Sequence, residues 1–323
     1  MNTDIELKHH IITEFARNFV PCLILEEHGY ISDIDELIEY FKKMVEGQIQ
    51  LAFSDGIPET VTREYKDKIN FNTFFEYYKL NLKIVPSNVL SYKGGAAPKS
   101  VYVHPQKGEL VCVPDIELTI NTNNALNAMK TFSFAIGHEL THCYDLLQYA
   151  KETGQDPWYS LNRNKYFDIR HNQIFGIGNN RAIAQMLYHL NKTERNAYIA
   201  QLRQELLSVK DKIKDSKTAI DAVKNTESYK KFISLENNIN IIFGITDKDV
   251  QTDLLSYTND IMVKKFTTYN QLKKYYLNRW QKWKYKYLTT ASKIVYDVYS
   301  KENKNEWLDY GMMGNNDIKI QEK

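Results

Sequence analysis

The residues with the clearest chemical potential are His138, Glu139 and His142, which form a His-Glu-x-x-His pattern. Four residues advance an α-helix by about one turn plus 40°, so both imidazoles leave the same face and can meet one Zn²⁺. Glu139 lies about 100° around the helix from His138, where its carboxylate can accept a proton from water. The spacing therefore predicts a zinc site with a general base beside it.

The elements around this motif must hold it in place. Apolar residues recur every three or four positions from Asn123 onward, which predicts a core-facing helix of about seven turns. Ahead of it, residues 100–104 and 109–113 are β-branched runs separated by a four-residue turn, which predicts a hairpin. We expect Pro114 to end that ladder, because proline has no N–H to donate.

The stretch Phe134-Ala-Ile-Gly-His-Glu-Leu-Thr-His resembles the active-site helix of the zincin metallopeptidases, and its last five residues read as they do in thermolysin-like enzymes. The resemblance covers about residues 82–210. It implies a small sheet ahead of the helix, Zn²⁺ as cofactor and hydrolysis of peptides held by an edge strand, for which residues 109–113 are the candidate. Asp145 and Gln148 stand where the metzincin branch requires Gly and His, so that branch does not fit.

In the gluzincin branch a glutamate from a later helix completes the ligand set, which implies Glu194 as the third ligand. Glu194 opens a helical segment, and the small Ala197 one turn on would let that helix approach the first closely. Asn191-x-x-Glu194 is also a capping box, in which Glu194 would bond the Asn191 backbone instead. The other candidates for the third ligand are His171, Asp168, His189 and Glu205.

Two positions depart from the thermolysin-like pattern. That family has an Asp four residues after the third ligand, where this chain has Tyr198; Asp145 could supply the missing hydrogen bond to a ligand, or could be a solvated helix charge. No histidine follows His189, so the imidazole that steadies the oxyanion in that family is missing. A neutral tyrosine hydroxyl could replace it. The catalytic candidates are Tyr198, Tyr188 and His171, with core packing as the alternative for each tyrosine.

The remaining chain indicates a mainly helical protein. Gly and Pro number only 13 and 7 of 323 residues, against 23 Tyr and 14 Phe, which favours long helices with bulky packing. We expect an α+β fold, mostly helical, with a zincin-like core whose small mixed or antiparallel sheet precedes the active-site helix. The expected regions are an N-terminal helical region at 1–80, the catalytic core at 81–210 and a C-terminal helical region at 211–323.

Residues 262–304 hold 11 Lys and Arg against two acids, interleaved with tyrosines and tryptophans. This composition is typical either of a surface on which nucleic-acid bases stack or of an amphipathic helix with solvated lysines. Helical spacing favours packing for Leu272, Tyr276, Trp280, Trp283 and Tyr287. We therefore do not expect nucleic acid as a partner, and keep these basic helices as a candidate surface for a protein partner.

Overall composition excludes several classes of protein. The net charge of +2 gives no global attraction to nucleic acid or anionic lipid. Three widely spaced cysteines exclude a disulfide framework, and no apolar stretch reaches the ~18 residues of a membrane span. No signal peptide is visible, so we expect a cytoplasmic or non-classically released protein, of bacterial or viral origin from its Lys/Asn/Ile/Tyr-rich usage.

The expected function is that of a zinc metalloendopeptidase acting on a protein or peptide substrate, with Glu139 as general base. Two alternatives remain. The long helical additions suggest a catalytically silent zincin-like module of a larger assembly. The basic helix at 262–304 suggests a nucleic-acid-associated protein.

Overall fold

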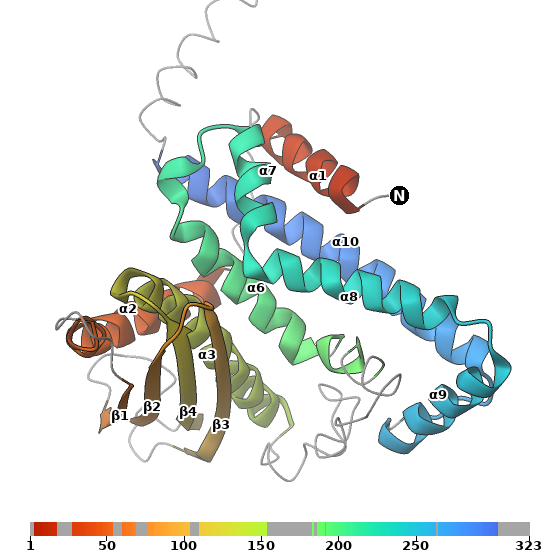
Figure 1. Ribbon diagram of the computed structural model, residues 1–323, viewed down its shortest axis with the longest axis horizontal. Coiled ribbons are helices and arrows are strands. Elements are labelled where there is room, and N and C mark those ends of the chain that lie inside the picture. Colours follow the sequence, from red (N-terminus) through yellow and green to blue (C-terminus); the bar gives the residue numbers. More distant parts are fainter. Residues whose placement is uncertain are drawn as a thin grey trace, which may run out of the picture.

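The computed structural model describes residues 3–17, 28–53, 60–68, 77–103, 110–153, 183, 186–190, 192–262 and 264–302. Its elements are α1 Thr3–Arg17, α2 His28–Leu51, β1 Val61–Lys68, β2 Tyr77–Pro86, β3 Ser91–Val103, β4 Leu110–Thr122, α3 Ala125–Thr153, α6 Lys192–Leu207, the 3₁₀ turn η2 Lys210–Lys212, α7 Ser216–Asn225, α8 Glu227–Gly244, α9 Lys248–Ile261 and α10 Tyr269–Glu302. The fold is α+β and mostly helical, as expected, with the strands gathered on one side and α7–α10 on the other (Figure 1).

The described strands form one mixed sheet in the order β1-β2-β4-β3, with β2 and β4 parallel and the other pairs antiparallel. The hairpin between β3 and β4 is confirmed by the pairing of Val103 with Leu110. The expectation that Pro114 ends the ladder is wrong, because β4 continues through it to Thr122. Pro114 instead pairs opposite Pro98, and the register shifts there because neither proline can donate a hydrogen bond.

One face of the sheet is covered by α2 and α3, which lie behind it in Figure 1. Alternate residues of the two central strands are buried against these helices: Leu80, Leu82, Ile84, Ile116, Leu118 and Ile120. This period of two explains why one face packs and the other does not. The Asn124 side chain accepts a 2.8 Å hydrogen bond from Asn127 N and so caps α3 at its start. Sequence reasoning missed β1, a strand rich in charged residues.

A second core joins α1 to the helices from α6 onward. The packing interpretation of the basic helix is confirmed, because the aromatic residues of α10 at helical spacing are buried, and the Tyr287 ring stacks on Phe232 at 4.1 Å between centroids. The buried Lys284 ammonium lies 2.9 Å from carboxylate oxygens of both Glu6 and Glu236, which ties α1 and α8 to α10. None of the described helices has the length and apolar character needed to cross a bilayer.

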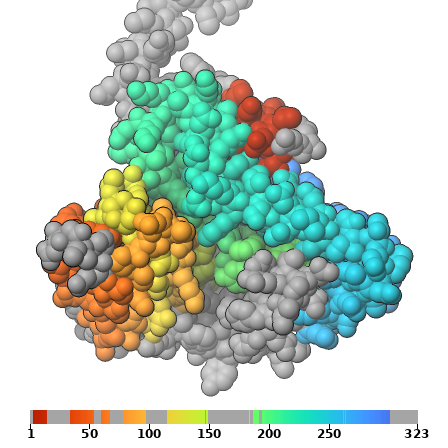
Figure 2. Space-filling model, in the orientation of Figure 1, coloured from red at the N-terminus to blue at the C-terminus, as the bar shows by residue number. Residues whose placement is uncertain are grey.

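Helix α6 joins the two cores. It packs along α3, and residues near its start are visible between the strands and the later helices in Figure 2. Gly137 allows close packing here, because a Cβ at that position would lie 2.9 Å from Ile38 Cδ1 on α2 and 3.4 Å from Gln204 Cγ on α6. Gln204 also donates a 2.6 Å hydrogen bond to Asp35 of α2. Three helices are therefore fixed together one residue before His138.

Substitution of Phe41 on α2 tests the core beneath the sheet. Phe41 is fully buried, and its ring meets the Tyr78 ring edge-on at 5.0 Å between centroids. Phe41→Ala should lower the free energy of unfolding by about 3–5 kcal/mol, through lost burial and the cavity left behind. Leu51→Ala on the same helix is the control, because Leu51 is 60% exposed and its loss should cost less than about 0.5 kcal/mol. Urea unfolding measures both, and equal losses would contradict this description of the core.

Candidate metal centre

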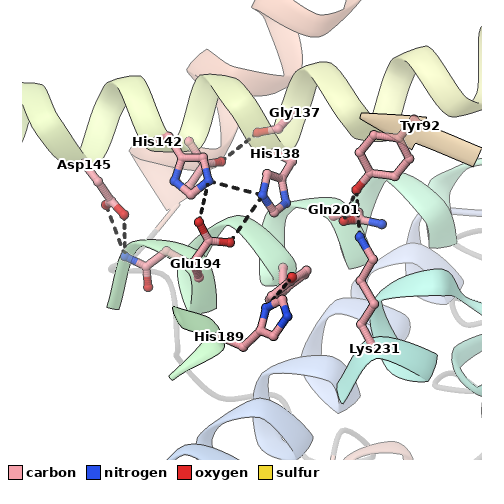
Figure 3. Close-up of polar contacts among 12 residues, drawn as sticks. Tyr92, Gly137, His138, His142, Asp145, His189, Glu194, Gln201 and Lys231 are labelled. Carbon is pink, nitrogen blue, oxygen red and sulfur yellow. Dashed lines mark hydrogen bonds and ion pairs between the residues drawn. The ribbon is translucent and has the colours of Figure 1, made fainter. Parts of the chain in front are cut away.

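Three side chains from two helices converge on one point. His138 and His142 leave adjacent turns of α3, and Glu194 reaches them from the first turn of α6 (Figure 3). Glu194 Oε1 lies 3.3 Å from His142 Nε2, and Oε2 lies 3.8 Å from His138 Nε2. One ligand atom from each residue falls within 4.8 Å of the other two. The described chain therefore brings together a group that could hold a metal ion, and Glu194 is its third member.

Burial keeps the two histidines in the neutral form that can bind a cation. Desolvation is the main cause that lowers the pKa of His142 to about 4 and that of His138 well below its usual value, so both rings are neutral near pH 7. Their Nε2 atoms lie only 3.2 Å apart. Two imidazole nitrogens and one carboxylate form a donor set that suits Zn²⁺, which binds nitrogen and oxygen at about 2.0–2.2 Å. The residues present thus fit the expected cofactor.

Glu139 lies beside this trio, only 4% exposed. Desolvation, followed by the charge of Glu194, raises the pKa of Glu139 to about 8, while Lys231 acts in the opposite direction. A bound divalent cation would favour the ionised form. A carboxyl whose pKa lies near neutrality can both accept and return a proton.

The strand that reaches Glu139 is β3, which is an edge strand of the described sheet. A Cβ at Gly94 would collide with Glu139 Oε1 and lie 2.9 Å from Leu118 Cδ2, so the backbone can approach only because residue 94 is glycine. We expected residues 109–113 to supply the edge at the site. Residues 110–113 belong to β4 and pair with β3, and it is Gly94 of β3 that lies against Glu139. Residue 109 lies outside the described residues.

Asp145 contributes to the relative placement of α3 and α6. Both of its carboxylate oxygens accept from the Asn196 amide, at 3.1 and 3.0 Å. Asn196 lies two residues beyond Glu194, so this contact fixes the turn of α6 that carries the third ligand. Asp145 is buried, at 8% exposure, and is not the solvated charge that the sequence left open.

The aromatic candidates lie around the trio. The Tyr198 ring meets His138 edge-on at 5.3 Å, and its hydroxyl lies 2.8 Å from His189 Nδ1. The pKa of Tyr188 is raised by desolvation first and then by the charge of Glu194 and a hydrogen bond to it. His189 thus pairs with a tyrosine outside the His-His-Glu group. His171, Asp168 and Asn191 lie outside the described residues.

The last candidate, Glu205, belongs to a buried chain of hydrogen bonds that sequence reasoning missed. Tyr92 Oη of β3 donates to Gln201 Oε1 at 2.9 Å, and Gln201 Nε2 donates to Glu205 Oε1 at 2.8 Å. Ser228, at the start of α8, donates to Glu205 Oε2 from both its backbone N–H and its hydroxyl. Lys231, one turn further along α8, donates to Tyr92 Oη at 3.1 Å. No spacing in the sequence distinguishes these residues from others of the same types elsewhere in the chain.

Comparisons with protein-family models, curated protein sequences and solved structures find no match for this chain. The interpretation of the centre therefore rests on its own residues and geometry.

Metal binding tests the trio directly. The purified protein should bind one divalent cation per chain, and His142→Ala or Glu194→Ala should weaken that binding by more than the roughly 10–100-fold that loss of an outer hydrogen-bond partner costs. His189→Ala is the matched control, since its imidazole pairs with Tyr198 and should leave the stoichiometry unchanged. Elemental analysis and competition with a chelator measure both quantities. Loss of the metal in His189→Ala, with retention in Glu194→Ala, would show that the ligand set is wrong.

Proposed function

We propose that the protein is a zinc-dependent peptidase of the zincin type, with a gluzincin-like ligand set. The observation that carries the proposal is the convergence of His138, His142 and Glu194 in a buried site, with Glu139 next to His138 on α3. A metal site that served structure alone would be closed by a fourth protein ligand. The group found among the described residues has three members, so a Zn²⁺ held by them alone would keep one coordination position for a reactant.

When bound, Zn²⁺ supplies Lewis acidity, which draws electron density from water and from a carbonyl oxygen. The chain's own residues handle the proton. A Glu139 carboxylate oxygen accepts a proton from water as the water oxygen bonds to the peptide carbonyl carbon. Glu139 then delivers that proton to the amide nitrogen as the carbon–nitrogen bond breaks. The products are a carboxylic acid and an amine, and Glu139 returns to its starting state.

Other residues hold the substrate in this proposal. An extended peptide can pair its backbone with the outer edge of β3, where Gly94 places the strand directly against Glu139. Tyr198 is the candidate donor to the developing oxyanion, because its ring already contacts His138 and its hydroxyl is oriented by His189. The buried rings of α10 leave the nucleic-acid alternative without a stacking surface at those positions.

Glu139→Gln separates binding from turnover. The amide keeps the shape of the side chain but cannot accept the proton, so hydrolysis should fall by about 10²–10⁴-fold while zinc content stays at one per chain. Cleavage of a mixed peptide library, followed by mass spectrometry, measures the first quantity, and elemental analysis measures the second. Full activity in Glu139→Gln would refute the mechanism. Zinc binding without any wild-type hydrolysis would favour the catalytically silent module.

Gly94 and Gly95 provide a second test within one strand. Gly94→Ala places a methyl group where Glu139 Oε1 now lies, whereas a Cβ at Gly95 meets nothing within 4 Å. Because a displacement of about 1 Å at a catalytic group can cost about 100-fold in rate, Gly94→Ala should lower kcat/KM to that degree with zinc content intact. Gly95→Ala should remain close to wild type. Similar rates for the two variants would remove β3 from the active site.

A further inference from the structure

Lys231 extends from α8 of the helical core toward the metal centre (Figure 3). Its ammonium donates to the Tyr92 hydroxyl at 3.1 Å and lies 4.8 Å from the centroid of that ring. It also lies 5.4 Å from the centroid of Tyr198. The Tyr198 ring therefore contacts both Lys231 and His138. This places a positive charge beside Tyr198, the proposed donor to the oxyanion.

This ammonium is not neutralised by a direct partner. Within the described residues no carboxylate oxygen lies within 4.0 Å of Lys231 Nζ, and its one hydrogen bond goes to a neutral phenol. The residue is exposed, yet desolvation is the main cause that lowers its pKa, ahead of the opposing charges of Glu205 and Glu194. A lysine has three N–H donors, so two remain for a ligand.

The surrounding hydrogen bonds fix this arrangement in advance. Tyr92 gives its only proton to Gln201, so its hydroxyl oxygen faces Lys231 as an acceptor. Gln201 is held in turn by Glu205, which is anchored by Ser228 at the start of α8. The sheet, α6 and α8 are thus joined by one chain of bonds that ends at the ammonium. Tyr92 is a positioning residue here, and Lys231 is the group available to a ligand.

We propose that Lys231 binds a carboxylate of the peptide substrate, namely the free C-terminal carboxylate of the residue that follows the scissile bond. The inference rests on the proposed peptidase function and names its substrate class: peptides cleaved close to their C-terminus. An extended chain advances about 3.3 Å per residue, so a carboxylate on the next residue lies near the reacting carbonyl. The Lys231 ammonium is likewise close to the centre, because the Tyr198 ring contacts both Lys231 and His138. An acidic side chain is the other source of the same group.

The test uses a library of N-acetylated peptides, each made with a free C-terminal carboxylate and as the C-terminal amide, with and without an internal Asp. The zinc-loaded wild type should cleave the carboxylates at least tenfold faster than the matched amides, as expected for one hydrogen bond to a charged group. Lys231→Met, which keeps the aliphatic stem over the tyrosine rings, should lose most of this preference, and Lys231→Arg should keep it. Mass spectrometry gives the rates and the cleavage positions.

Lys230→Met is the matched control. Lys230 is the preceding residue on α8, and its 56% exposed side chain pairs with Glu227 at 2.6 Å. This variant should retain the wild-type preference. Thermal unfolding and zinc content check that each variant is folded and loaded. If Lys231→Met does not fold, Lys231→Gln takes its place, and a wild type without carboxylate preference overturns the proposal whatever the variants do.

A binding measurement separates this inference from the peptidase proposal. Zinc-loaded Glu139→Gln is mixed with the library, and the peptides retained on ultrafiltration are identified. The inference is supported if peptides with a free C-terminal carboxylate are retained more than the matched amides, and if this difference disappears in Glu139→Gln/Lys231→Met. This result counts even where turnover is absent. Equal retention of carboxylates and amides overturns it even if the wild type is an active peptidase. If amidated peptides are retained only when they contain the internal Asp, Lys231 binds an acidic side chain. That result overturns the C-terminal assignment.

Discussion

The packing of α6 against α3 is the contact on which the whole centre depends. His138 and His142 are placed by the helical repeat alone. Glu194 is separated from His142 by 51 residues and can meet the two histidines only if α3 and α6 touch. Gly137 permits that close approach on one side of His138. The bonds from Asn196 to Asp145 then set the rotation of the first turn of α6. A shift of one residue in this packing would turn Glu194 away from both imidazoles, because each residue rotates a helix by about 100°.

The same packing creates an electrostatic problem that a cation solves. Glu139 and Glu194 are each 4% exposed and lie close enough for one to raise the pKa of the other. Burying two neighbouring carboxylates without compensation is costly, since each loses its hydration and repels the other. The two neutral imidazoles carry no balancing charge, and Lys231 is not in direct contact with either carboxylate. A divalent ion held by His138, His142 and Glu194 would supply the missing positive charge.

Local patterns allowed much of this centre to be predicted from the sequence. The His-Glu-x-x-His spacing and the apolar stripe of α3 depend only on residues within one helix, and the β3–β4 hairpin depends on a short turn. Gly94, Lys231 and Tyr92 could not be found in this way. Their roles arise from the tertiary packing of β3 and α8 against α3 and α6, and their residue types are common in surfaces and cores alike. β1 was missed because its charged residues hide the alternation that marks a strand.

The location of the centre between two cores gives each core a separate task. The sheet core supplies the ligand helix and the edge strand that carries Gly94, while the helical core supplies Lys231 through α8. Glu194 and Gln201 both come from α6, so this helix connects the metal site to the chain of bonds that ends at Lys231. A change in how α8 sits on α6 would therefore move the ammonium relative to the metal ligands while leaving the ligands themselves in place. Under the proposed function, substrate selection could therefore vary independently of the chemistry, because Lys231 lies on α8 whereas Glu139 and the two histidines lie on α3.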